Sequence, residues 1–214
     1  MIIGIVSDTH GNVNSLQNVY KFLKKEVKIN KFIHLGHDFS DIDKGKLEEQ
    51  SQNNNNDETV SGEDSTFFTD LASVLVSKEQ EQIQDPLLSK IHKIYQVPGK
   101  GDKQYGNPLY SSVLYVSLGG VIFVLVHNIK QLKQEDLVNG SVILHGETHT
   151  AQAEMLAGRI FVNPGHISDN NPDSGFAVIV VDNNKIQVLH YDLNYTIIDN
   201  KNFTLKRTRK FGAS

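Results

Sequence analysis

The hydrophobic pattern of the first part of the chain predicts a strand, a helix and a second strand. Residues 2–6 form an apolar, β-branched run, too short for a buried helix, which predicts a strand covered on both faces. Over residues 16–27 apolar positions recur at helical spacing opposite several lysines, which predicts an amphipathic helix capped by Asn12 or Asn14. Residues 31–36 predict another short strand, and this order implies a parallel pair with a right-handed crossover.

The second half of the chain is predicted to be rich in strands, with a short polar helix over residues 130–138. The strand predictions cover residues 112–118, 121–126, 142–145, 154–162 (as one strand or a pair), 176–181 and 185–191. Gly119-Gly120 and the polar residues 182–184 each predict the turn of a hairpin. We therefore expect mixed sheets in which parallel and antiparallel pairs occur together.

The chain changes character at about residues 43–85. Residues 47–85 hold ten acidic residues and one lysine, together with a low-complexity run of glutamine and asparagine. Such a composition buries too little apolar surface to order itself, which predicts a flexible acidic insertion, although residues 67–83 have spacing compatible with a docked helix. We expect one domain over residues 1–200 that contains this insertion, followed by a basic tail or edge strand at 201–214.

Composition narrows the chemistry. The 214 residues include nine histidines and no cysteine, so disulfides and thiolate metal sites are excluded, and imidazole and carboxylate groups are the available ligands. The sequence shows neither a signal-type N-terminus nor an apolar run near the roughly 20 residues of a membrane span, so we expect a soluble, cytoplasmic protein without a membrane partner. The net charge is −4, and outside the acidic insertion the balance is slightly positive. This suits an anionic substrate but gives no argument for nucleic acid.

Side chains that can bind metal or phosphate follow five of the predicted strands or turns. Because parallel strands end at the same edge of a sheet, we expect these groups to converge. They are Asp8 and His10, His37 and Asp38, Lys100 and Asp102, His127, and Glu147 and His149. His34 and His145 lie inside apolar strands and are interpreted as buried core histidines, whereas His166 lines either the pocket or its rim.

Several blocks occur in one order along nearly the whole chain: residues 7–12, Leu35-Gly36, 97–102, Val126-His127, 146–149 and Asn163-Pro164-Gly165. In these blocks the chain resembles the calcineurin-like metallophosphoesterase superfamily, and within it the small bacterial and archaeal phosphodiesterases. The resemblance implies an α/β (α+β) fold, a four-layer β-sandwich of mixed sheets flanked by helices. It also implies one or two divalent ions, Mn, Zn, Fe or Ni, that hydrolyse a small phosphomonoester or phosphodiester.

Three positions depart from the pattern that the resemblance implies. His37 stands where the family has its bridging aspartate, Lys100 where it has asparagine, and Glu147 where it has the first histidine of Gly-His-Thr-His. An imidazole nitrogen does not bridge two ions as a carboxylate does, and an ammonium group is repelled by a metal. The retained ligand positions are Asp8, His10, His127 and His149.

Three interpretations follow. In the first, Asp8, His10, His37 and His149 hold one ion, and Lys100 replaces the charge of a second; catalytic roles are then expected at Asp8, His10, Lys100 and Asp102. In the second, Asp38 is the bridge and Glu147 a ligand of a rearranged two-metal site. In the third, the site has decayed and holds no metal, and the protein is an inactive binding module, as in the small scaffold subunit of the retromer coat, which the chain also resembles. The substrate, the metal and the oligomeric state, a homodimer included, stay open.

Overall fold

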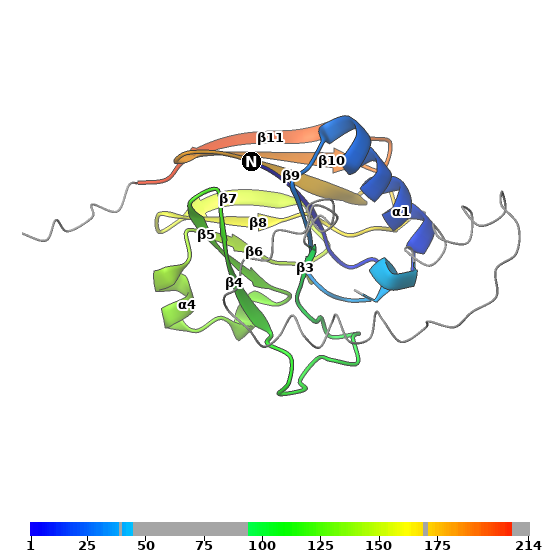
Figure 1. Cartoon of the computed structure of the whole chain (residues 1–214), viewed down its shortest axis with the longest axis horizontal. Coiled ribbons are helices and arrows are strands. Elements are labelled where there is room, and N and C mark those ends of the chain that lie inside the picture. The colour runs from blue at the N-terminus through cyan, green and yellow to red at the C-terminus, as the bar shows by residue number, and fades with distance from the viewer. Residues whose placement is uncertain (39, 45–93, 169–170, 207–214) are drawn as a thin grey trace, which may run out of the picture.

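The computed structural model describes residues 1–38, 40–44, 94–168 and 171–206 (Figure 1). The predicted insertion at 43–85 lies almost entirely outside the described residues, as do the helix predicted at 67–83 and the last eight residues of the chain. In the described ranges, no helix combines the length and apolar character that a membrane span requires.

Two mixed β-sheets form the body of the protein. The six-stranded sheet has the order β11 (Ile197–Thr204), β10 (Lys185–Asp192), β9 (Gly175–Asp182), β1 (Ile2–Val6), β2 (Lys31–His34) and β3 (Ile94–Gln96). The five-stranded sheet has the order β4 (Val113–Leu118), β5 (Val121–Val126), β6 (Val142–Leu144), β8 (Arg159–Asn163) and β7 (Gln152–Leu156). β1, β2 and β3 run parallel to one another at one side of the six-stranded sheet. β5, β6 and β8 run parallel to one another in the centre of the five-stranded sheet. Antiparallel strands complete both sheets.

The strand predictions are confirmed. β1 and β2 form the expected parallel pair, the two hairpins are β4 with β5 and β9 with β10, and the 154–162 segment is a strand pair, β7 with β8. β11 forms the outer edge of its sheet beside β10, so the described start of the basic segment is an edge strand.

The core lies between the sheets and is built from the inward-facing apolar residues of both. A second apolar cluster lies between the six-stranded sheet and α1 (Val13–Phe22), where Leu16 and Val19 are buried. α1 continues as the π-helical turn Leu23–Val27. On the outer side of the other sheet lies α4 (Gln134–Asn139), in which Asp136 accepts a hydrogen bond from the Tyr115 hydroxyl of β4. The order helix, sheet, sheet, helix is the predicted four-layer sandwich (Figure 1).

One local prediction is wrong in detail, and the predicted capping residue is correct in position only. The polar helix expected at 130–138 is split into the 3-10 turn Ile129–Gln131 and α4, because Leu132 and Lys133 have extended backbone angles. Asn12 precedes α1 as predicted, but its side chain makes no capping bond. Its amide instead donates to the carbonyls of Thr9 and Ile167, which ties the loop after β1 to the loop after β8.

The loops that follow the parallel strands of both sheets are joined at one edge of the sandwich. The N–H of Asp8 donates to the Gly36 carbonyl, and the N–H of Ile167 donates to the Asp8 carbonyl. The N–H of Gly146 donates to the carbonyl of His127. Backbone hydrogen bonds therefore join the loops after β1, β2 and β8, and separately the loops after β5 and β6.

His34, at the end of β2, should make the fold sensitive to mild acid. It is fully buried, and burial lowers the pKa of its imidazole from 6.5 to about 4. The unfolded chain takes up this proton near pH 6.5 and the folded chain only near pH 4, so the free energy of unfolding falls as the pH drops through this window. We expect a loss of about 3 kcal/mol when the pH is below 4, measurable by urea unfolding at a series of pH values.

His34→Asn is the matched control for this slope. Nδ1 of His34 accepts a hydrogen bond from the Gly36 N–H at 3.1 Å, and the asparagine amide oxygen can take over that bond without titrating. Burial also lowers the pKa of His145 and His190. Both histidines are present in the parent and in the variant, so their contribution to the pH dependence is the same in the two proteins. An identical pH slope in both proteins would show that His34 carries no part of it.

Candidate metal centre

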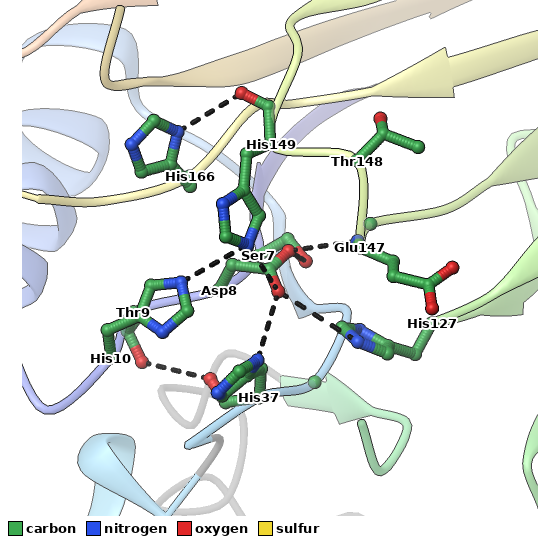
Figure 2. Close-up of polar contacts among 12 residues, drawn as sticks. Ser7, Asp8, Thr9, His10, His37, His127, Glu147, Thr148, His149 and His166 are labelled. Atoms are coloured by element: carbon green, nitrogen blue, oxygen red, sulfur yellow. Dashed lines mark hydrogen bonds and ion pairs between the residues drawn. The ribbon is translucent and has the colours of Figure 1, made fainter. Parts of the chain in front are cut away.

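Asp8 lies in the loop after β1 with one oxygen satisfied and the other not. Its side chain is fully buried, and Oδ2 accepts hydrogen bonds from Ser7 Oγ at 2.5 Å and from the Glu147 N–H at 3.1 Å. Oδ1 has no hydrogen-bond partner. Three imidazole nitrogens face Oδ1, those of His37 at 3.5 Å, His149 at 3.5 Å and His127 at 3.9 Å (Figure 2). This is the arrangement of ligand atoms around a cation.

The hydrogen bonding of His127 supports this interpretation independently. Its Nδ1 lies 2.8 Å from the Leu35 carbonyl oxygen, which can only accept, so Nδ1 carries the hydrogen. In the neutral ring Nε2 then presents a lone pair toward Oδ1 of Asp8, which is itself an acceptor. Two buried acceptors that face each other without a hydrogen repel, and a bound cation removes that repulsion. A ligand histidine typically has its second nitrogen held by such a carbonyl.

The ligand atoms form three overlapping groups, within each of which they lie within 4.8 Å of one another. The groups are Asp8, His37 and His127; Asp8, His10 and His149; and His10, His37 and Asp38. Asp8 belongs to the first two groups, and the Nε2 atoms of His10 and His149 lie 3.2 Å apart. The structure therefore brings six of the seven predicted metal ligands together.

Glu147, Lys100 and Asp102 are placed differently. The backbone N–H of Glu147 supports Asp8, but its exposed carboxylate accepts a hydrogen bond from the Asn128 side chain at 2.6 Å and joins none of the three groups. Lys100 is exposed on the loop after β3. Oδ2 of Asp102 accepts hydrogen bonds from the backbone N–H groups of His37 and Gly99, which holds these two loops together.

The backbone at the site has an unusual conformation. Six candidate residues have positive φ, a region that residues other than glycine rarely occupy. They are Asp8 (52°), His10 (50°), His37 (63°), Asp38 (66°), Glu147 (67°) and His149 (57°). Each such residue costs about 1–2 kcal/mol, and clusters of this kind occur where the surrounding structure enforces them, often at functional sites.

The protonation of His10 also suits a metal ligand. Burial lowers the pKa of its imidazole, and the neighbouring imidazoles of His37 and His149 lower it further. The neutral form, which is the one that binds a metal ion, is therefore favoured at neutral pH.

Sequence reasoning assigned no role to two supporting residues, Ser7 and Asp41, and left the place of His166 open. Ser7 donates to Asp8, and the fully buried carboxylate of Asp41 accepts hydrogen bonds from the Thr9 hydroxyl and the Gly11 N–H, both at 2.9 Å. His166 lies behind the site, where its ring stacks on His149 and its Nδ1 donates to the His149 carbonyl at 3.1 Å. Sequence alone marked His166 by its place after Asn163-Pro164-Gly165, whereas no pattern distinguishes Ser7 or Asp41 from ordinary loop residues.

Comparison with known proteins identifies the family. Residues 1–186 match the profile of the calcineurin-like phosphoesterase superfamily domain. A comparison with curated proteins found no match.

Solved structures with a similar fold include two phosphoesterases and a Vps29. A predicted phosphoesterase of Streptococcus pneumoniae has 18% identity and a TM-score of 0.56, with 95% of this chain and 97% of that chain covered. The Escherichia coli phosphoesterase YfcE has 19% identity and a TM-score of 0.52, with 94% and 98% covered. Vps29 of Chaetomium thermophilum has 15% identity and a TM-score of 0.56, with 96% and 100% covered. At these identities the likeness shows the fold, and together with the family profile it shows that the chain belongs to the calcineurin-like phosphoesterase superfamily.

Proposed function

We propose that the protein is a metal-dependent hydrolase of small phosphomonoesters or phosphodiesters. The observation that carries the proposal is the buried, unpartnered Oδ1 of Asp8, which three imidazole nitrogens face. The family and the phosphoesterase fold neighbours support the reaction class.

The residues present fit a divalent ion. Asp8, His10, His37 and His149 would hold it, with His127 beside them. A divalent ion held there would supply Lewis-acid chemistry, polarising a phosphoryl oxygen and activating water as the nucleophile. Asp102 and Gly99 keep the His37 loop in place through backbone hydrogen bonds, and the exposed Lys100 on the same loop can add positive charge for an incoming phosphate.

The proposal predicts that hydrolysis depends on a removable metal. Hydrolysis of bis(p-nitrophenyl) phosphate and p-nitrophenyl phosphate should fall to background after chelation, and at least one of Mn²⁺, Zn²⁺, Fe²⁺ and Ni²⁺ should restore it. The His149→Ala variant should be inactive with every metal, because it removes a ligand atom that lies 3.5 Å from Asp8 Oδ1. Metal content by mass spectrometry and initial rates by absorbance provide the measurements.

Glu135→Gln is the matched control, since Glu135 is exposed on α4 and outside the site. Turnover that survives in His149→Ala would identify a contaminating phosphatase. A folded protein with neither bound metal nor turnover would refute the proposal.

A second candidate function is that of an inactive binding module. It is favoured by the placement of the substituted residues, since Lys100 is exposed and the Glu147 carboxylate is bonded to Asn128. A Vps29 among the fold neighbours is consistent with it. The same assays decide between the two, because the binding module requires no turnover with any metal.

A further inference from the structure

The ligand atoms that converge around Asp8 are almost all nitrogens. In the two groups that share Asp8, the other members are the imidazoles of His10, His37, His127 and His149. Asp38 joins a third group, in which its partners are again imidazoles. Among the described residues, the two groups that share Asp8 thus offer four imidazoles and a single carboxylate, and of these side chains only Asp8 and His127 are buried.

His37 is the imidazole that links the groups, and its ring is held from several sides. It belongs to the Asp8 group with His127 and to the rim group with His10 and Asp38. Its ring makes an edge contact with His10 at 4.2 Å between centroids. A Cβ at Gly101 would lie only 2.7 and 2.8 Å from its Cδ2 and Nε2 atoms, so the Gly101 backbone packs directly against the ring. The His37 ring, of which 30% is exposed, is therefore packed from two sides, which favours a fixed orientation of its nitrogens.

Charge limits how many ions the site can hold. Neutral imidazoles leave Asp8 as the one negative side chain in the two groups that share it, so one divalent ion gives a net charge of about +1 there. A second divalent ion beside it would raise this to about +3 around the buried Asp8, at an electrostatic cost. One ion leaves a positive site that still attracts an anionic phosphate.

From these observations we infer that the site takes one borderline divalent ion that prefers nitrogen ligands, with Zn²⁺ as its representative, and that it discriminates against Mn²⁺ and Mg²⁺. Mn²⁺ and Mg²⁺ favour carboxylate, carbonyl and water oxygens, whereas imidazole suits Zn²⁺, Ni²⁺ and Fe²⁺. His37 is the residue that sets this preference. The inference rests on the metal binding of the proposed function but not on hydrolysis.

Titration calorimetry of the chelator-stripped full chain tests the inference without any activity assay. Zn²⁺ should bind with a stoichiometry of one and far more tightly than Mn²⁺. His37→Asp, which replaces a nitrogen ligand with an oxygen ligand, should lower the ratio of the Mn²⁺ to the Zn²⁺ dissociation constant by about tenfold or more. Co²⁺ absorption spectra should change in the same variant, because they report the nitrogen content of the ligand set.

Gln134→Asp is the matched control, because it adds the same carboxylate at an exposed position on α4 and should leave the ratio unchanged. His10→Asp is a second test variant should His37→Asp fail to fold, which circular dichroism would reveal. Two Zn²⁺ ions per chain, equal affinity for Mn²⁺ and Zn²⁺, or a ratio that neither variant alters would each overturn the inference. Selective Zn²⁺ binding without hydrolysis would refute the proposed function but support the inference. Preferential Mn²⁺ binding together with hydrolysis would support the proposed function but refute the inference.

Discussion

Replacing Asp8 with asparagine should abolish metal binding and hydrolysis while making the metal-free protein more stable. The asparagine oxygen can accept the hydrogen bonds that Ser7 and the Glu147 N–H now give to Oδ2. Its amide nitrogen would take the place of the unpartnered Oδ1 and donate to a facing imidazole. We expect metal affinity to fall about a hundredfold or more. The free energy of unfolding without metal should rise by about 1 kcal/mol or more, because a buried charge without a partner is removed.

Urea unfolding of chelator-treated proteins and calorimetry with Zn²⁺ measure the two effects separately. Glu135→Gln removes an exposed acidic charge on α4 and should change neither quantity. A metal-free Asp8→Asn variant that is less stable than the parent would mean that the charge of Asp8 is compensated without an ion, and the basis of the metal site would then be lost.

Gly99→Ala should be among the most damaging single-methyl additions to the chain. A Cβ at this position would overlap the backbone nitrogen of His37 and lie 2.9 Å from both the Gly36 carbonyl carbon and Cε1 of His127. Backbone atoms cannot rotate away, so the loops after β2 and β3 must separate. We expect a loss of about 3 kcal/mol in the free energy of unfolding, together with weaker Zn²⁺ binding because two ligand histidines move.

Gly120→Ala serves as the control for a purely conformational cost. Gly120 has a φ of +79°, and nothing lies within 4 Å of a Cβ built there. Its replacement should cost about 1 kcal/mol through backbone strain alone and leave Zn²⁺ binding unchanged. Equal losses in urea unfolding for the two variants would show that the close packing at Gly99 relaxes at no cost.

Much of the fold could be predicted because the residues that each strand or helix buries recur along the sequence with the period of that element. Residues 2–6 are apolar throughout since β1 is covered on both faces, and Gly119-Gly120 marks the turn between β4 and β5. The break before α4 could not be predicted, because the apolar spacing does not reveal the extended backbone at Leu132 and Lys133. The acidic insertion and the single-domain boundary remain predictions.

For the candidate site, the sequence could predict which strand ends carry possible ligands but not how each side chain is oriented. Strand ends located the groups around Asp8, and the resemblance to the family predicts that His37 stands in a ligand position. The orientation of Glu147 toward Asn128 and the use of Asp102 as a backbone acceptor depend on contacts between distant loops. Local sequence does not encode such contacts, and the roles of these residues therefore stay predictions.

The left-handed backbone at the six site residues has a consequence for directed evolution. Glycine adopts this conformation without strain, so a library selected only for heat resistance should accumulate glycine at positions such as His10, Asp38 and His149. Each such gain would delete a side chain of the candidate metal centre. A thermostability screen would then enrich substitutions at the candidate site without an assay of its chemistry, because relief of backbone strain stabilises those positions.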